Sequence, residues 1–125
     1  MRLETNSDNT SYAIRAYDDE GITVNDEKFT HSFIISPDKL IPHWRPIKFT
    51  ELTIDDVAEV LNLRQEILIL GCGKHSVLPD QSIIDAIRKK EIGFEIMDTY
   101  AACRCYSILI SEGRSVAAGL IIDQE

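Results

Sequence analysis

The sequence predicts a mixed α/β (α+β) domain, in which an N-terminal antiparallel β meander is fused to a β-α-β-α-β half with parallel strands and about three helices. Short apolar segments separated by polar turns between residues 12 and 42 indicate the meander. After residue 49, apolar strands alternate with helix-periodic segments, as in right-handed parallel crossovers. The 125 residues, 44% of them hydrophobic, suit a single compact domain over residues 11–125, with residues 1–10 as a flexible tail.

The meander is expected to hold three strands. The first covers residues 13–17 and is followed by a turn of three acidic residues and a glycine at 18–21. A shorter second strand covers residues 22–24, and a longer third strand covers residues 29–35 before a Ser-Pro-Asp turn. The segment 42–46 begins and ends with proline, which indicates an irregular connection to the second half.

The first helix is expected to begin after Thr53. Asp56 lies three residues further on, so the pair resembles a capping box. Acidic residues in the first turn also suit the positive end of the helix dipole. The predicted apolar face consists of Val57, Val60 and Leu61.

A second helix is expected between two buried strands. The first of these strands covers residues 67–70 and the second covers residues 94–97. Pro79 and Asp80 are suited to the start of the helix, and Gly93 lies just beyond its end.

A third helix is expected over residues 101–112, with Thr99 as its N-cap and Gly113 at its C′ position. An apolar strand over residues 116–122 follows it. The residues predicted on the inner face of this third helix are Ala101, Cys105, Ile108 and Leu109.

Composition excludes some classes of function. Lysine plus arginine total 13 and aspartate plus glutamate total 21, giving a net charge of −8, which would repel the phosphates of nucleic acid. No apolar run approaches the ~20 residues of a membrane-spanning helix. The polar first ten residues resemble neither a secretory signal nor a transit peptide. A cytoplasmic location is therefore expected, with the three cysteines reduced.

Two segments of the chain resemble a known family. They are Leu-Gly-Cys-Gly-Lys at residues 70–74 and Gly-Phe-Glu-Ile-Met-Asp-Thr-Tyr-Ala-Ala-Cys-Arg at residues 93–104. Together they are similar to a family that includes bacterial and archaeal hypothetical proteins and the mitochondrial assembly factor 3 of complex I (NADH:ubiquinone oxidoreductase). Cys72 stands where relatives often carry threonine, and Cys105 and Ser107 stand where they usually carry threonine and asparagine.

The resemblance implies a mixed α/β fold with a β-rich N-terminal half and no settled reaction, because the family has none. Complex I assembly belongs to the mitochondrial members, and its extension to this chain is an analogy. The favoured function is a non-catalytic, assembly-factor-like domain that contacts protein partners, as a monomer or homodimer in a bacterial cytoplasm. No catalytic residue, cofactor or metal is assigned.

The competing function is a small-anion or small-molecule binding protein, or an enzyme, that uses the ends of two parallel strands. Such strands end at one edge of a sheet, so Gly73 and Thr99 would face one pocket, with Lys74 and Arg104 as cationic groups. The structural alternative is that the glycines only form a tight turn and Thr99 only caps a helix. The candidate residues are Gly71, Cys72, Gly73, Lys74, Asp98, Thr99, Cys103 and Arg104.

The glycine turn matches no complete nucleotide-binding motif. Gly71-x-Gly73 is not followed by the third glycine of the dinucleotide fingerprint. Lys74 is followed by His75 rather than by the Ser or Thr of a P-loop. Asp98 stands roughly where a ribose-binding acid would lie in a nucleotide fold.

The cysteines offer two further interpretations. Cys72, His75, Cys103 and Cys105 could supply four zinc ligands, but residues two apart on a helix point ~200° away from each other, so no zinc site is expected. A redox role for Cys72 and Cys103 is an alternative, because a helix start and Arg104 would both lower the pKa of a thiol. The structural alternative is that small buried cysteines fill space.

A partner contact is predicted at Trp44 and Arg45. Trp44 is the only tryptophan and lies between two prolines, and Trp and Arg are enriched at protein interfaces. The alternative is that the indole covers the sheet, as large aromatic side chains ordinarily do.

Overall fold

The computed structural model describes residues 11–75 and 78–123, so the tail expected over residues 1–10 lies outside the described residues. The elements in chain order are β1 (Ile14–Tyr17), β2 (Ile22–Val24), β3 (Glu27–Phe29), β4 (Phe33–Ser36), β5 (Lys39–Ile41), the 3₁₀ turn η1 (Phe49–Glu51), α2 (Ile54–Leu61), β6 (Ile67–Gly71), α3 (Gln81–Arg88), β7 (Gly93–Met97), α4 (Thr99–Ser111) and β8 (Val116–Leu120).

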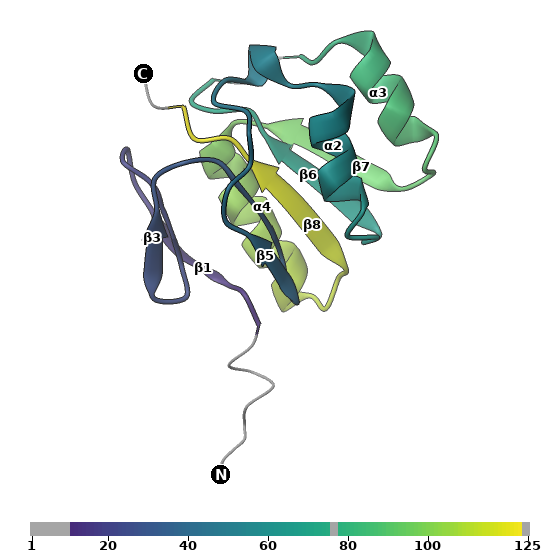
Figure 1. Cartoon of the computed structure of the whole chain (residues 1–125). Coiled ribbons are helices and arrows are strands. Elements are labelled where there is room, and N and C mark those ends of the chain that lie inside the picture. The colour runs from purple at the N-terminus through teal and green to yellow at the C-terminus, as the bar shows by residue number, and fades with distance from the viewer. Residues whose placement is uncertain (1–10, 76–77, 124–125) are drawn as a thin grey trace.

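The strands form two sheets (Figure 1). One is an antiparallel meander in the order β1-β2-β3. The other has the order β5-β4-β8-β6-β7, in which β6 is parallel to both β7 and β8, and β4 is antiparallel to β8 and β5. The prediction of an antiparallel meander fused to a parallel half in one mixed α/β domain is therefore confirmed.

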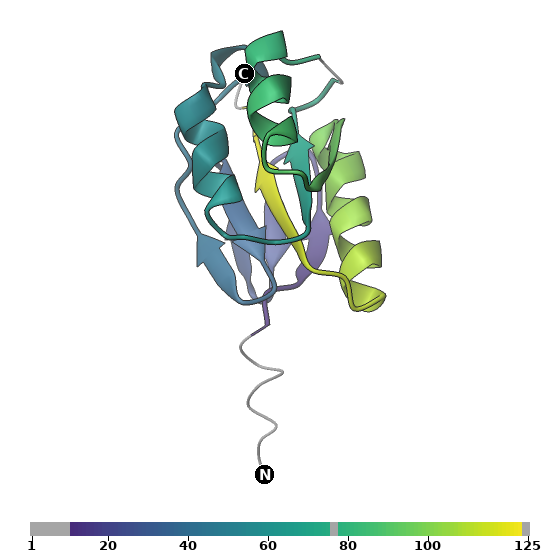
Figure 2. The ribbon, with the colours of Figure 1, turned by 90° about the vertical axis from the view of Figure 1, so that its right-hand side faces the viewer.

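The five-stranded sheet is covered on both faces (Figure 2). α2 and α3 cover one face, and α4 and the three-stranded sheet cover the other. Neighbouring residues of a strand point to opposite faces. Accordingly, Leu68 and Leu70 of β6 pack with Val57 of α2, whereas Ile69 packs with Tyr106 of α4. Burial on both faces explains why the sequence of β6 is apolar throughout.

The single strand predicted over residues 29–35 is wrong. β3 ends at Phe29 in the three-stranded sheet, and β4 begins at Phe33 in the five-stranded sheet. The chain changes sheets between them, where Ser32 O accepts a hydrogen bond from Trp44 N at 3.0 Å. Strand periodicity is the same in either sheet, so an apolar run carries no signal for this change. The short strand β5 was also not predicted.

The capping residues predict most helix boundaries correctly. Thr53 caps α2 in a reciprocal capping box, Asp80 is the N-cap of α3, and Gly113 follows α4 with a φ of 76°. Gly93 is an exception, because it begins β7. Glu91, with a φ of 56°, has the left-handed conformation after α3 instead.

The inner face predicted for the third helix is rotated from the observed one. α4 buries Ala102, Cys103 and Tyr106, and the predicted residues Cys105 and Leu109 are half-buried against the same core. Ile108, also predicted to be inside, is 57% exposed. Small and apolar residues occupy most positions around the circumference of this helix. Its sequence therefore has no clear polar face that would indicate how the helix is rotated about its axis. This rotation determines where Cys103 and Arg104 lie.

Candidate functional site

The candidate site begins where β6 and β7 end side by side. The two strands are parallel and in register up to Gly71, which lies opposite Met97. Beyond the ladder, Cys72 N donates to Met97 O at 2.8 Å, and Thr99 N donates to Gly73 O at 2.8 Å. The structure therefore brings Gly73 and Thr99 together at the edge where the sequence places them.

The Thr99 side chain joins three segments of the chain. Its hydroxyl accepts a hydrogen bond from Gly73 N at 2.8 Å and donates one to Ile121 O at 2.6 Å. Ile121 N in turn donates to Gly71 O at 3.0 Å. Thr99 is 5% exposed, so loss of its hydroxyl would leave buried polar groups without partners. We call Gly71, Gly73, Thr99 and Ile121 the strand-end cluster.

The prediction that Thr99 caps the third helix is wrong, because Asp98 occupies that position. The Asp98 carboxylate accepts a hydrogen bond from Ala101 N at 2.9 Å, and Thr99 is the first residue of α4. Asp and Thr are both good N-caps, so the local sequence does not distinguish them. The Asp98 carboxylate, considered above as a ribose ligand, thus has a structural role.

Both glycines of the turn have structural roles. A Cβ atom on Gly71 would lie 3.0 Å from Thr99 Cα and 3.0 Å from Leu120 Cδ2, which is tighter than ordinary packing allows. Gly73 has a φ of +99°, in the region that favours glycine. The backbone geometry of the turn therefore accounts for both glycines without a ligand.

A small hollow lies beside the strand-end cluster. Its cavity volume is about 20 Å³, which is room for one or two water molecules. Its lining includes the start of α4 but, among the described residues, none of α3. Of the two helices that follow β6 and β7, only α4 therefore contributes described residues to the hollow. The charged residues that line the hollow are Asp18, Asp19, Lys74 and Asp123, so carboxylates outnumber the ammonium group and oppose an anion.

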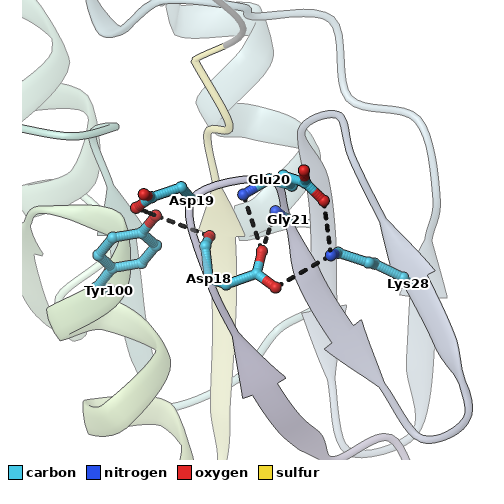
Figure 3. Close-up of polar contacts among 6 residues, drawn as sticks. All are labelled: Asp18, Asp19, Glu20, Gly21, Lys28 and Tyr100. Atoms are coloured by element: carbon cyan, nitrogen blue, oxygen red, sulfur yellow. Dashed lines mark hydrogen bonds and ion pairs between the residues drawn. The ribbon is translucent and has the colours of Figure 1, made fainter.

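The turn between β1 and β2 forms one wall of this hollow, and Figure 3 shows the polar contacts of that turn. The Tyr100 hydroxyl of α4 donates to Asp18 O at 2.7 Å and contacts Asp19 Oδ1 at 3.3 Å. Lys28 Nζ binds Asp18 Oδ2 at 3.1 Å and Glu20 Oε1 at 3.3 Å. The sequence identifies these acidic residues as a turn but gives no role to Tyr100, whose contacts connect the meander to α4.

Cys103 and Arg104 do not line the hollow. Arg104 Nη1 donates to Tyr17 OH at 3.0 Å, and Cys103 and Arg104 both line a separate groove between β1 and α4. The Tyr17 ring also stacks on Tyr100, with ring centroids 5.2 Å apart. The eight candidate pocket residues therefore do not lie around one cavity.

Cys72 and Cys103 lie on opposite faces of the five-stranded sheet. Cys72 packs in the core beneath α2 and α3, and Cys103 packs in the core beneath α4. The thiol of Cys72 donates to Met97 O at 3.1 Å, and none of the three cysteines forms a disulfide bond within the residues that the structure describes. This placement contradicts a redox pair. Within residues 11–75 and 78–123, no three His, Cys, Asp or Glu side chains gather as metal ligands would.

Labelling of Cys103 is expected to be slow in the native protein. Burial raises the pKa of its thiol to about 12, despite the opposing effect of Arg104, so its reactive thiolate is scarce near pH 8. Alkylation followed by mass spectrometry should give a rate for Cys103 at least roughly 100-fold below the rate in denaturant. Cys105, which is half-buried, should react earlier. Rapid native labelling of Cys103 would revive the redox interpretation.

Trp44 and Arg45 have different environments. The Trp44 indole is 4% exposed, and its Nε1 donates to Asp56 O at 3.2 Å, so it offers almost no surface to a partner. Arg45 is exposed, and its guanidinium binds Asp56 Oδ2 at 2.6 Å and Glu51 O at 2.6 Å. Of the two predicted contact residues, only Arg45 is accessible.

Asp56 is expected to make stability sensitive to acid. Burial raises the pKa of its carboxyl, but hydrogen bonds from Arg45 and Thr53 outweigh burial and hold the pKa below the usual value of 3.8. Stabilisation by this carboxylate is therefore complete above about pH 4 and is lost as the pH falls through its lower folded-state pKa. Asp56→Asn should cost about 1 kcal/mol at neutral pH.

Chemical denaturation at pH 7 and pH 3 tests this expectation. The stability difference between wild type and Asp56→Asn should shrink at pH 3. Asp55→Asn is a matched control, since Asp55 is an exposed carboxylate in the same helical turn. A difference for Asp56→Asn that is unchanged between the two pH values would contradict the assigned role of the charge.

The fold and the strand-end cluster define a small mixed α/β protein whose parallel strand ends are closed by its own threonine side chain. The chain belongs to the family described as protein of unknown function (DUF498/DUF598), which matches residues 14–121. The family predicted from residues 70–74 and 93–104 is therefore confirmed.

Two kinds of relative carry descriptive names. NADH dehydrogenase [ubiquinone] 1 alpha subcomplex assembly factor 3 of Xenopus tropicalis is 30% identical over 125 residues, with 98% of this chain and 67% of that protein covered. The human protein of the same name is 28% identical, with 86% of this chain and 59% of that protein covered. This chain thus spans about three fifths to two thirds of these relatives. The 13 kDa major membrane protein of Francisella tularensis is 26% identical, with 78% and 80% covered.

Solved structures share the fold. A crystal structure of a Bordetella parapertussis protein has a TM-score of 0.86 at 30% identity, covering 91% of this chain and 98% of that one. An NMR structure of a Xanthomonas campestris protein has a TM-score of 0.79 at 36% identity, covering 89% and 84%. Within the part of the chain that the structure describes, no helix has the length and apolar character needed to cross a membrane.

Proposed function

We propose that this chain is a non-catalytic, assembly-factor-like domain that works by contact with protein partners. The observation that carries the proposal is the strand-end cluster. Ligands of α/β sheets usually bind in the crevice beyond the strand ends, but here the Thr99 hydroxyl lies in that position and uses the Gly73 amide. The proposal is further supported by the relatives named as complex I assembly factors.

The proposed location is the cytoplasm. The three cysteines form no disulfide bond in the part of the chain that the structure describes, which is usual in reducing compartments. Cell fractionation tests this proposal, and recovery of the protein in the membrane fraction would contradict it.

The competing small-anion function has specific support in Lys74, an exposed cationic residue that lines the hollow. Because Asp18, Asp19 and Asp123 also line the hollow, phosphate, sulfate and ATP are each expected to leave the melting temperature unchanged at millimolar concentration. A saturable rise that Lys74→Glu abolishes and that Lys89→Glu, an equal charge reversal at an exposed residue away from the hollow, preserves would favour the anion-binding function instead.

Capture with a crosslinker in the source cells tests the protein-binding function. The tagged chain should recover the same partner in replicate experiments, and that partner, once purified, should bind the purified chain directly without added nucleotide or metal. Absence of any direct protein partner would contradict the proposal, whatever the groove described below does.

A further inference from the structure

A groove runs between the edge strand β1 and helix α4. Its cavity volume is about 390 Å³, far larger than the hollow at the strand-end cluster. All four residues of β1 form one wall. The other wall is a stripe of α4 in which positions four apart lie one above the other, formed by Cys103, Arg104, Ser107 and Ile108.

The groove is basic although the protein is acidic. Arg15 and Arg104 line it, and no carboxylate does among the residues that the structure describes, in a chain with a net charge of −8. Arg104 uses one donor on Tyr17 OH, which leaves several of its five N–H donors available. Arg15 is exposed and forms no ion pair with any residue that the structure describes. Guanidinium groups with N–H donors still available are well suited to bind carboxylates.

The rest of the groove suits an extended peptide. Ile108 is 57% exposed, and Ile14 lies on the opposite wall, so an apolar side chain placed between them would be removed from water. Among the strands that the structure describes, β1 pairs only with β2. An edge strand presents backbone N–H and C=O groups to a further extended segment, which is a recurring mode of peptide recognition.

We propose that this groove binds an extended acidic segment of a partner protein. Its carboxylates contact Arg15 and Arg104, and an apolar side chain lies against Ile14 and Ile108. The inference rests on the proposed protein-binding function and names the chemistry of the partner. A peptide suits the groove better than a lipid, because an acyl chain cannot use the directional backbone groups of β1.

Selection from a random peptide library against the full chain tests this assignment. Selected peptides should be enriched in Asp and Glu beside apolar residues, and a fluorescently labelled one should bind at least tenfold more weakly to Arg15→Glu. Ser107→Trp fills the groove without changing charge and should weaken binding similarly. Arg88→Glu, an equal charge reversal on α3 at the other face of the sheet, should leave binding unchanged.

Several outcomes would overturn the assignment. Selected peptides that as a set lack acidic enrichment would do so, as would a peptide that binds equally to Arg15→Glu and Arg88→Glu. Arg15-dependent binding of anionic phosphatidylglycerol vesicles, in place of peptides, would also contradict the assignment. A change in the molar mass of the free protein when the groove is altered would indicate a second copy of the chain as the occupant. Unchanged binding of the captured partner to Ser107→Trp would refute the groove as its site while leaving the protein-binding function intact.

Discussion

Replacement of Trp44 by alanine is expected to lower the free energy of unfolding by about 3–5 kcal/mol. The indole is 4% exposed and lies in the core with Val60 and Leu70. Its Nε1 also donates to Asp56 O, so the substitution removes both packing and a hydrogen bond that holds the first turn of α2. Because Trp44 is the only tryptophan, circular dichroism during chemical denaturation is the suitable measurement.

Gly119 provides a direct check on this packing. A Cβ atom there would lie 2.6 Å from Trp44 Cη2 and 3.1 Å from Val60 Cγ2, so Gly119→Ala should cost about 1–3 kcal/mol in the wild type. A Trp44→Leu background removes the two closest contacts of that Cβ atom, both of which are with the indole, so the same substitution should cost much less there. Equal costs in the two backgrounds would show that the ring does not lie where the structure places it.

Replacement of Thr99 by valine is expected to lower the free energy of unfolding by about 2–4 kcal/mol, because two buried polar groups each lose a partner. Valine preserves the shape but leaves Gly73 N and Ile121 O unsatisfied. Hydrogen exchange at the Gly73 amide should accelerate in this variant. Thr99→Ser, which retains the hydroxyl and loses one methyl group, is the matched control and should cost about 1 kcal/mol.

Equal stabilities of Thr99→Val and Thr99→Ser would contradict the assigned role of the hydroxyl. They would also reopen the strand-end crevice as a ligand site, because the Gly73 amide would then not depend on Thr99.

Local signals predicted much of the fold. The capping box at Thr53 requires only residues within one turn, and the apolar run of β6 requires only burial on both faces. The parallel neighbours β6 and β7 follow from a short crossover between two such runs. The meeting of Gly73 with Thr99 follows from that pairing, so the position of the strand-end cluster was predictable.

The chemistry of the site depended on contacts that the local sequence does not contain. Thr99 is an excellent N-cap by type, but its hydroxyl is used by Gly73 and Ile121, which are 26 and 22 residues away. Asp98 consequently caps the helix. A pocket residue identified by its type alone can therefore have a wholly structural role.

The rotation of α4 about its axis explains why Arg104 does not lie at the strand-end cluster as predicted. Residues five apart on a helix differ by about 140° in direction, so Arg104 does not share the direction of Thr99. Its actual neighbour, Tyr17, comes from β1, 87 residues earlier in the chain. Only the packing of β1 against α4 shows that Arg15 and Arg104 line one groove.

Native mass spectrometry of the protein isolated gently from its source cells tests the central claim most directly. If the strand-end cluster is structural and the chain works by protein contact, the spectrum should show the chain together with a protein partner and without a stoichiometric small molecule. A single chain that carries one small molecule per protein, lost in Lys74→Glu, would contradict the account.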